Sequence, residues 1–441
     1  MADARPQVVI VGGGFGGLYA ARELARAPVR VTVIDRHNYH LFQPLLYQVA
    51  SATLSPADIA RPIRRVLHRN QNTEVLLGQV EEVRADARSV RLRGGQEISY
   101  DYLILASGAV DQYFGHPEWA AIAPALKTID DATEIRRRFL LAFEAAEHES
   151  DPAMQRALLT FVLVGGGPTG VEMAGAFAEI ARHTLRKDFR HMDPASAQII
   201  LVEGGPRLLA AYPPELSASA QRQLEGLGVT VCLNSIVTGI EFGSVHVGDE
   251  RIPAYNVVWS AGVSASPLGK TIGAGVDRSG RVVVEPDLSV PGHPEIFVIG
   301  DLAAFTHQLP DGMPLPGVAQ VAMQGGRAAA RNIVRTIQDE KRRPFHYRDK
   351  GSMATIGRAK AIADIGGVHL SGFIAWLTWI FVHILFLIGF RNRLTVMLEW
   401  AWSYLSWERG ALLITGEVRP DTVRQRVEAS MPPWEERGGR A

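Results

Sequence analysis

The feature that most constrains this chain is a glycine-rich segment that occurs twice, each time between an apolar run and a stretch with helical spacing of apolar residues. In a G-x-G-x-x-G segment the first glycine permits a tight turn, the second lets a pyrophosphate approach the backbone, and the third lets helix and strand pack closely. The phosphates are then held by free N–H groups at the helix start. The sequence therefore predicts two dinucleotide-binding sites. Their residues are Gly12, Gly14, Phe15, Gly16 and Gly17 in the first segment and Gly165, Gly167, Pro168, Thr169 and Gly170 in the second.

Each predicted unit closes on an acidic residue at the end of a second apolar run. Asp35 follows the run 29–34 at about the distance from its loop at which an acid accepts a hydrogen bond from a ribose hydroxyl. Glu203 stands farther from its loop than the usual ~20 residues, because the polar stretch 178–196 precedes its strand. An acid at this place repels a 2′-phosphate and favours NADH over NADPH, although Arg207 lies nearby.

Two further apolar runs, 102–105 and 296–299, have the length and composition of buried strands. The second lies beyond the inner glycine unit, which indicates that one domain interrupts the other. A chain of 441 residues has room for two or three domains of about 150 residues each. We therefore expect an α/β fold with two Rossmann-like dinucleotide-binding domains. The expected ranges are 1–115 continuing at 285–340 for the outer domain, 155–275 for the inner domain, and 345–441 for a C-terminal region.

Composition excludes several classes of protein. Lys plus Arg and Asp plus Glu each number 46, so no basic footprint of a nucleic-acid-binding domain is present. The single cysteine, Cys232, cannot form an internal disulfide or a redox-active dithiol. His and Cys residues do not cluster with the spacing of metal ligands, so we expect no metal. The N-terminal segment lacks the basic and long apolar parts of a signal peptide, which predicts a cytoplasmic body.

The C-terminal region is strongly apolar. The segment 372–390 contains no Asp, Glu, Lys or Arg, and five of the eight tryptophans fall at 376, 379, 400, 402 and 407. As one helix the segment would be about 28 Å long, just enough for the ~30 Å hydrocarbon core of a bilayer. We favour a helix in the bilayer interface, with Arg391 and Arg393 at the phosphates, over a spanning helix or a buried helix between subunits.

Two dinucleotide sites in one chain suggest hydride transfer from a nicotinamide to a flavin, with the reacting atoms held about 3–3.5 Å apart. Three segments resemble the two-dinucleotide-binding flavoproteins, whose domains are arranged as in glutathione reductase. The run 296–299 continues into Gly300-Asp301, like the third FAD signature of that superfamily. The turns Ala106-Ser107-Gly108 and Trp259-Ser260-Ala261-Gly262 resemble its small-residue turns. The resemblance implies FAD in the outer domain and NADH in the inner one.

Within that superfamily the sequence resembles type II NADH dehydrogenase over essentially the whole chain. Segment 41–50, LFQPLLYQVA, is similar to the family's segment near the flavin, and segment 319–324, AQVAMQ, is similar to its A-Q-x-A-x-Q quinone motif. The apolar tail is similar to its membrane-binding region. Carried over to this chain, Gln320 and Gln324 lie beside the flavin ring and the quinone, and Glu172 lies where nicotinamide meets flavin.

The resemblance implies the following sites, with Glu172, Gln320 and Gln324 as catalytic residues. FAD is expected at Gly12, Gly14, Phe15, Gly16, Gly17, Asp35, Arg36, Gln43, Ser107, Gly108, Asp301, Ala319 and Gln320. NADH is expected at Gly165, Gly167, Pro168, Thr169, Gly170, Glu172, Glu203, Ala261 and Gly262. The quinone is expected at Tyr47, Gln48, Gln320 and Gln324, where core packing of Tyr47 and Gln48 is an equal alternative.

The implied activity is FAD-dependent oxidation of NADH with electron transfer to a membrane quinone, without proton pumping. The resemblance also implies a homodimer whose C-terminal region binds the lipid bilayer at the cytoplasmic face of the cell membrane. Disulfide reductases and sulfide:quinone oxidoreductases of the superfamily need more cysteines than this chain has. Two alternatives stay open: a soluble NADH-dependent ferredoxin- or rubredoxin-type reductase, and an NADH-sensing flavoprotein with slow turnover.

Overall fold

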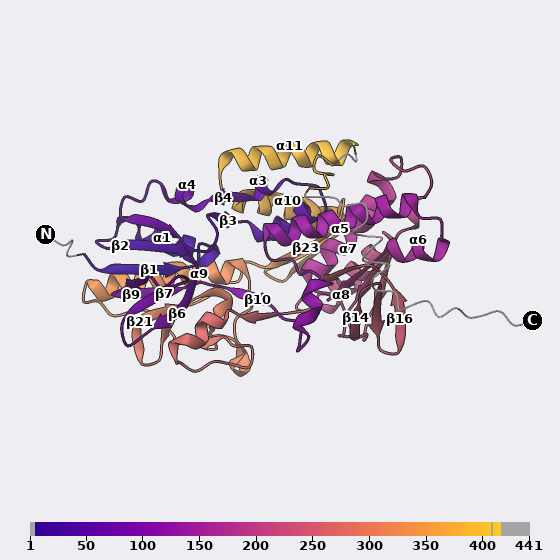
Figure 1. Ribbon diagram of the computed structural model, residues 1–441. Coiled ribbons are helices and arrows are strands. Elements are labelled where there is room, and N and C mark those ends of the chain that lie inside the picture. The colour runs from indigo at the N-terminus through magenta and orange to yellow at the C-terminus, as the bar shows by residue number, and fades with distance from the viewer. Residues whose placement is uncertain (1–4, 407–408, 416–441) are drawn as a thin grey trace, which may run out of the picture. The chain divides into compact units, whose positions relative to one another are not determined.

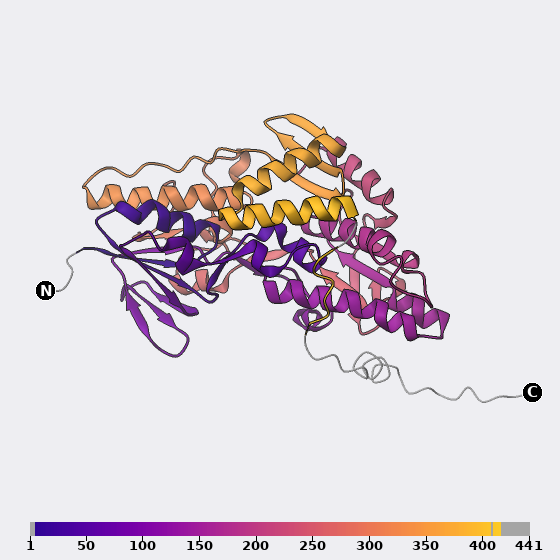
Figure 2. The same ribbon diagram turned by 90° about the horizontal axis from the view of Figure 1, so that it is seen from above.

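The computed structural model describes residues 5–406 and 409–415, which divide into two compact units (Figures 1 and 2). The first unit consists of 5–41, 60–111 and 263–350, and the second of 42–59, 112–262 and the described residues from 351 onward. Each unit therefore contains one of the two glycine loops. The expected domain ranges stay a prediction; the units differ from them in that segment 42–59 and the C-terminal region belong to the second unit.

The first unit is built on a six-stranded sheet in the order β20-β21-β9-β1-β2-β5. Figure 1 labels four of its strands, β21, β9, β1 and β2. The apolar runs at 8–11, 29–34, 102–105 and 296–299 supply its central strands, and β1 pairs in parallel with β2 and β9. Strands β1 and β9 are almost wholly buried, as is the second half of β21, which is expected when helices cover both faces of a parallel sheet. The strands are β1 (Gln7–Val11), β2 (Arg30–Asp35), β5 (Thr73–Leu77), β9 (Tyr102–Leu105), β20 (Ser289–Val290) and β21 (His293–Val298).

Helix α1 (Phe15–Glu23) packs closely against helix α9 (Ala319–Ile337), which begins at the predicted quinone motif. A methyl group at Gly326 would overlap the carbonyl oxygen of Gly16, so only glycine lets the two backbones approach this closely. The first unit also contains smaller elements: β3 (Tyr39–Leu41) with β4 (Ala60–Pro62), α4 (Ile63–Leu67), β6 (Val80–Arg84), β7 (Ser89–Leu92), β8 (Glu97–Ser99), β10 (Ala109–Asp111) with β18 (Val263–Ala265), and β19 (Val282–Val283) with β22 (Ala303–Ala304).

The second unit is built on a parallel sheet in the order β13-β12-β11-β17. The apolar run before the second glycine loop forms β11 (Thr160–Val164), and the run that ends before Glu203 forms β12 (Gln198–Val202). The stretch with helical spacing after the loop forms α7 (Pro168–Glu179). The unit also contains α2 (Leu46–Ala50), α3 (Pro56–Ile59), α5 (Ile129–His148), α6 (Pro152–Leu158), α8 (Pro214–Glu225), β13 (Val229–Cys232), β14 (Val237–Glu241), β15 (Ser244–Val247), β16 (Glu250–Pro253), β17 (Asn256–Trp259), β23 (Ser352–Gly357), β24 (Lys360–Ile365) and β25 (Val368–Ser371).

Aromatic packing fixes α7 within the second unit. The ring of Phe139 on α5 lies 4.1 Å from that of Phe177 on α7 and 4.8 Å from that of Phe161 on β11 (centroid distances), all buried. On another side, a methyl group at Gly175 of α7 would overlap the carbonyl oxygen of Ile356 on β23. The absence of a side chain at Gly175 therefore brings β23 directly against α7.

The C-terminal region forms two helices, α10 (Gly372–Phe386) and α11 (Phe390–Ser406), which lie side by side (Figure 2). The single helix predicted over 372–390 is wrong, because the backbone becomes extended at Leu387 and Gly389 adopts a φ of +98°. The 15 residues of α10 are about 22 Å long, too short for a bilayer core. No helix in the described part of the chain is long and apolar enough to cross a membrane. Trp407 lies outside the described residues.

Candidate functional site

The first glycine loop has the three steric environments that a dinucleotide loop requires. Gly12 has a φ of +107°, and a methyl group on it would overlap the carbonyl oxygen of Ala106. A methyl group on Gly17 would overlap the carbonyl oxygen of Gly12. Around Gly14, in contrast, no atom lies within 4 Å of the position of a Cβ. The first and third glycines therefore serve the fold, whereas the second leaves space for a group outside the protein.

The second loop repeats these environments. Gly165 has a φ of +108° and lies against the backbone of Ala261, and a methyl group on Gly170 would overlap the carbonyl oxygen of Gly165. The space around Gly167 is open, as it is around Gly14. Ser260 fixes the neighbouring turn, because its hydroxyl donates to the carbonyl oxygens of residues 164 and 165.

The two acids brace their loops in the same way. The carboxylate of Asp35 accepts hydrogen bonds from the N–H groups of Gly13 (2.5 Å) and His37 (2.7 Å). The carboxylate of Glu203 accepts hydrogen bonds from the N–H groups of Gly166 and Gly205, both at 2.6 Å. The longer sequence separation of Glu203 therefore does not change its place, since parallel pairing of β11 and β12 brings the strand ends together.

Two buried polar atoms near the first loop have no hydrogen-bond partner among the described residues: Nε2 of His40 and Oγ of Ser107. His40 is 2% exposed, and its Nδ1 lies 3.0 Å from the carbonyl oxygen of Gly13, so Nδ1 carries the hydrogen. Burial lowers the pKa of His40 to about 4, against this hydrogen bond to Gly13. The neutral Nε2 is then an acceptor for a hydroxyl or N–H group. These atoms and the space at Gly14 fit a cofactor such as FAD, whose ribityl and ribose hydroxyls are donors.

The remaining residues expected at FAD lie in both units. In the first unit, Asp301 follows β21, and Ala319 and Gln320 occupy the first turn of α9, whose N–H groups have no intrahelical partner. Arg36 is exposed. Gln43 is also exposed and belongs to the second unit.

The side-chain amide of Gln324 makes two hydrogen bonds to the backbone of Arg348 within the first unit. Its amide donates to the carbonyl oxygen of Arg348 at 3.0 Å and accepts from the N–H group of the same residue at 3.1 Å. Both ends of this amide are therefore used to hold the segment that leads into the C-terminal region. A direct contact of Gln324 with a quinone stays a prediction and requires that this pair of bonds open.

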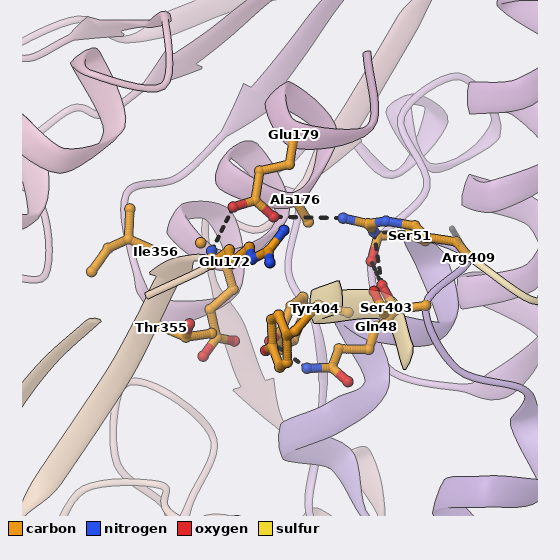
Figure 3. A pocket seen from close by; sticks show the side chains of 14 residues that line it. Gln48, Ser51, Glu172, Ala176, Glu179, Thr355, Ile356, Ser403, Tyr404 and Arg409 are labelled. Carbon is orange, nitrogen blue, oxygen red and sulfur yellow. Dashed lines mark hydrogen bonds and ion pairs between the residues drawn. The ribbon is translucent and has the colours of Figure 1, made fainter. Parts of the chain in front are cut away.

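The second unit contains a cavity that brings together three of the predicted residues: Tyr47, Gln48 and Glu172 (Figure 3). Its empty volume is about 550 Å³, including space open to solvent. The cavity is lined by segments far apart in the sequence, namely α2 and the residues after it, α7, β23, α11 and Arg409. The remaining lining residues, none of them predicted from the sequence, are Ser51, Thr53, Ala176, Glu179, Thr355, Ile356, Gly357, Arg358, Ser403, Tyr404 and Arg409.

A chain of hydrogen bonds orients Tyr47 and Gln48. The indole N–H of Trp400 donates to Oε1 of Gln48 at 2.7 Å, and Nε2 of Gln48 donates to the hydroxyl of Tyr47 at 2.8 Å. Because an indole N–H can only donate, it fixes which end of the amide faces Tyr47. The hydroxyl of Tyr47 therefore accepts from Gln48 and keeps its own hydrogen for an acceptor in the cavity. Burial, followed by the nearby Glu172 carboxyl, raises the pKa of Tyr47 well above its usual range.

Glu172 projects from the first turns of α7 toward Thr355 on β23 (Figure 3). Burial raises the pKa of its carboxyl to about 8, although a hydrogen bond from the N–H group of Thr355 acts in the opposite direction. Its side chain keeps some surface open to the cavity. With this pKa the carboxyl of Glu172 is protonated at neutral pH, and the residue lines the cavity.

Glu179 lies two turns farther along the same face of α7 and is paired with a cation (Figure 3). Its carboxylate lies 3.6 Å from the guanidinium of Arg409 and also accepts from the N–H group of Arg358. Arg409 donates in addition to the carbonyl oxygen of Ser51 and the hydroxyl of Thr53, both at 2.7 Å. Burial raises the pKa of Glu179 despite Arg409, and burial lowers that of Arg409, which stays protonated. In the sequence, only the i, i+7 spacing of Glu172 and Glu179 indicates that both carboxyl groups lie on one face of α7.

Comparison with known proteins identifies the family. Residues 6–326 match the family model described as pyridine nucleotide-disulphide oxidoreductase, and residues 350–406 match that of the NDH2 C-terminal domain. The chain is 46% identical to the type II NADH:quinone oxidoreductase NdhA of Mycobacterium tuberculosis over 94% of this chain and 90% of the relative. It is 31% identical to the type II NADH:quinone oxidoreductase of Staphylococcus aureus, over 84% of this chain and 92% of the relative.

A solved structure has the same fold. NDH2 from Plasmodium falciparum in complex with NADH superposes with a TM-score of 0.83 at 21% identity, over 91% of this chain and 99% of that one. The predicted α/β fold with a C-terminal helical region is therefore confirmed. The relatives oxidise NADH and transfer the electrons to a quinone. Because this similarity covers 94% of the chain, the chain belongs to the type II NADH:quinone oxidoreductases of the pyridine nucleotide-disulphide oxidoreductase family.

Proposed function

We propose that this protein oxidises NADH and transfers the electrons to a membrane quinone, with FAD on the first glycine loop and NADH on the second, without proton pumping. The observation that carries the proposal is the duplicated loop, in which an acid braces the turn while the second glycine, Gly14 or Gly167, faces open space. A single cysteine leaves no dithiol to accept electrons, which supports direct reduction of a quinone.

The residues around FAD and NADH would bind and orient. FAD, when bound, supplies a two-electron acceptor for the hydride of NADH. Asp301 and the N–H groups at the start of α9 would hold it together with Ser107 and His40. Glu203 would accept hydrogen bonds from the ribose hydroxyls of NADH. Its negative charge would disfavour NADPH, which carries a 2′-phosphate at this place. Ala261 and Gly262 would border the same cofactor.

The cavity residues would handle the proton that quinone reduction requires besides the hydride. Glu172 holds a proton at neutral pH beside the cavity. The hydroxyl hydrogen of Tyr47 is directed away from Gln48 and is available to a carbonyl oxygen of a quinone. Gln320 offers a donor and an acceptor at the start of α9. A contact of Gln324 with the quinone would require that its amide leave Arg348.

The test of the proposal is anaerobic mixing of the detergent-solubilised protein with NADH while the oxidised-flavin absorbance is followed, and then addition of a short-chain quinone. We expect rapid loss of the band and rapid recovery. Loss without recovery would overturn the quinone as acceptor and favour a protein acceptor, as in ferredoxin- or rubredoxin-type reductases, or an NADH-sensing role. No loss at all would overturn the assignment of both loops.

We further propose that α10 and α11 bind the bilayer surface at the cytoplasmic face of the cell membrane. Trp376 and Trp379 on α10 and Trp400 on α11 are buried in the second unit, while a second set of apolar side chains on the same helices is exposed. Such two-sided helices are typical of interfacial membrane binding. The exposed set comprises Phe373, Ile374, Leu377, Phe381, Leu385, Leu394, Met397, Leu398, Trp402 and Leu405.

The double substitution of Phe381 and Leu398 by Glu should release the protein from lipid vesicles, because each change removes a large apolar side chain and adds a charge. Burial of such a side chain contributes about 1.5–3 kcal/mol, so the loss should exceed ~100-fold in binding. Vesicle co-sedimentation measures it. The matched control is Ile236→Glu, at 67% exposure like Phe381 but outside both helices. Equal binding of the double variant and the control would contradict the proposal.

We also propose that the protein is a homodimer, as the family resemblance implies. Light scattering of the detergent-solubilised protein, corrected for bound detergent, distinguishes one chain of 48.1 kDa from two. A single-chain mass across the working concentration range would contradict the dimer.

A further inference from the structure

A strained turn precedes the aromatic cluster of the second unit. Phe114 and Gly115 have φ values of +48° and +96°, and the N–H group of His116 donates to the carbonyl oxygen of Tyr113 at 3.0 Å. Two positive φ values at the central positions define a type I′ turn, in which Asn-Gly is the preferred pair. A bulky residue at the first position is an outlier, since the left-handed region disfavours a large side chain. Phe114 therefore holds an unfavourable backbone conformation.

The turn places the ring of Phe114 on the surface over a glycine. A methyl group at Gly262 would lie 2.7 Å from Cζ of Phe114, so the ring covers Gly262 directly. The ring is tilted toward Trp259 at a centroid distance of 6.3 Å, and yet Phe114 remains 58% exposed. Neither packing nor the turn itself explains why an aromatic residue stands here, because most of its apolar surface faces solvent. Strain of this kind concentrates at binding sites.

The position lies at one end of the second dinucleotide site. Gly262 follows Ala261, whose backbone lies against Gly165 of the loop. In the sheet order β13-β12-β11-β17, Glu203 ends β12 on one side of the loop, and the turn 260–262 ends β17 on the other. With the ribose of the adenosine half at Glu203 and the pyrophosphate at the loop, the chain of the cofactor runs on past β11 toward β17. Phe114 therefore stands at the nicotinamide half.

We infer that Phe114 is a binding residue for the nicotinamide half of NADH, whose exposed ring the nicotinamide or its ribose covers. The inference rests on the proposed function, because it uses the assignment of NADH to the second loop. The strained turn then has a physical reason: the chain accepts an unfavourable φ at Phe114 in order to hold the ring over Gly262.

The test is Phe114→Asn, which converts the turn to the preferred Asn-Gly pair and removes the ring. We expect the melting temperature to rise, the KM for NADH to increase about 3–10-fold, as expected for loss of one aromatic contact, and the inhibition constant of ADP-ribose to stay unchanged. Phe114→Tyr keeps the aromatic ring and should have the wild-type KM for NADH. The control is Arg88→Asn, at an exposed turn residue with a φ of +47°, where the same relief of strain should leave the KM unchanged.

Three outcomes would overturn the inference. An unchanged KM for NADH in Phe114→Asn would leave the ring without a role in binding. A parallel rise in the inhibition constant of ADP-ribose would place the effect on the adenosine half or on the loop. An equal KM increase in Arg88→Asn would mean that the KM effect of Phe114→Asn comes from the change in stability and not from loss of the ring. Failure of the proposed function is separate, because the wild-type protein would then bind neither NADH nor ADP-ribose in calorimetry.

Discussion

Replacement of Glu172 by Gln is expected to lower the rate of quinone reduction about 100-fold without loss of FAD. The protonated carboxyl faces the cavity that Tyr47 and Gln48 also line, and a positioned proton donor contributes typically ~10²–10⁴ in rate. An amide keeps the shape and the hydrogen-bond donor but cannot release a proton. Rapid mixing of the reduced protein with a short-chain quinone measures the rate, and the flavin content of the purified variant measures retention. An unchanged rate would remove Glu172 from the mechanism.

The pH dependence of quinone reduction follows from the pKa of Glu172, which is about 8. Below pH 8 Glu172 holds its proton, and above pH 8 it loses it. Quinone reduction by the wild-type protein should therefore fall as the pH rises through 8, whereas the residual rate of Glu172→Gln should be flat across the same interval. A wild-type profile that is flat between pH 7 and 9 would contradict the assignment.

The same substitution should stabilise the fold at alkaline pH. In the unfolded chain Glu172 has its ordinary pKa of 4.5. Below that pH it is protonated in both the folded and the unfolded state, so it does not change the free energy of unfolding. Between pH 4.5 and about 8 the unfolded state ionises and the folded state does not, so the free energy of unfolding falls as the pH rises. Glu172→Gln removes this loss. Its melting temperature should equal that of the wild type below pH 4.5 and exceed it at pH 8.

Glu179→Gln is the matched control for this prediction. It makes the same chemical change on the same face of α7, but Glu179 is paired with the buried Arg409. Removal of the carboxylate leaves a buried guanidinium without its counter-ion, which typically costs about 3–5 kcal/mol. We therefore expect Glu179→Gln to lower the melting temperature at pH 8, in the opposite direction to Glu172→Gln. Changes in the same direction would contradict this account of the cavity.

Valine at the second glycine of each loop should remove one cofactor at a time. Gly14 and Gly167 have negative φ values of −70° and −73°, and no atom lies within 4 Å of either Cβ position. The apo fold should therefore tolerate a side chain at both places, while a bound pyrophosphate would be displaced. Overpacking of this kind costs typically ~1–3 kcal/mol, which corresponds to about 5–150-fold in affinity. We expect Gly14→Val to purify without flavin and Gly167→Val to keep flavin with an about 5–150-fold higher KM for NADH.

Flavin absorbance per protein, thermal melting and NADH kinetics together measure these effects. The control Gly275→Val changes another glycine of the first unit that has open surroundings, and it should affect neither cofactor. Gly17→Val should instead prevent folding of the loop, because even a methyl group would overlap Gly12. Loss of flavin from Gly167→Val with normal flavin in Gly14→Val would reverse the assignment of the two loops.

The sequence by itself determined the strands, the loops and the acids that close each glycine unit. These features depend on neighbours along the chain: apolar runs form buried strands, and only glycine fits where Gly12 turns and where Gly17 contacts Gly12. The acids could be predicted as well, since a residue at the end of β2 or β12 must lie at the edge where its loop lies. Glu203 has the same place beside its loop as Asp35, although more residues separate it from that loop. The parallel pairing of β12 with β11 sets this place, whatever the length of the segment between the two strands.

The tertiary structure alone decided the chemistry of the cavity and the shape of the tail. Glu172 follows a glycine loop like many helical acids, and its high pKa comes from burial beside β23, which begins 180 residues farther along (352 − 172). The tail lacks charges over 372–390, and yet Gly389 breaks it, so that Trp379 and Trp400 pack together. Desolvation and packing depend on which distant segments surround a group, and a pattern of neighbouring residues carries no information about that.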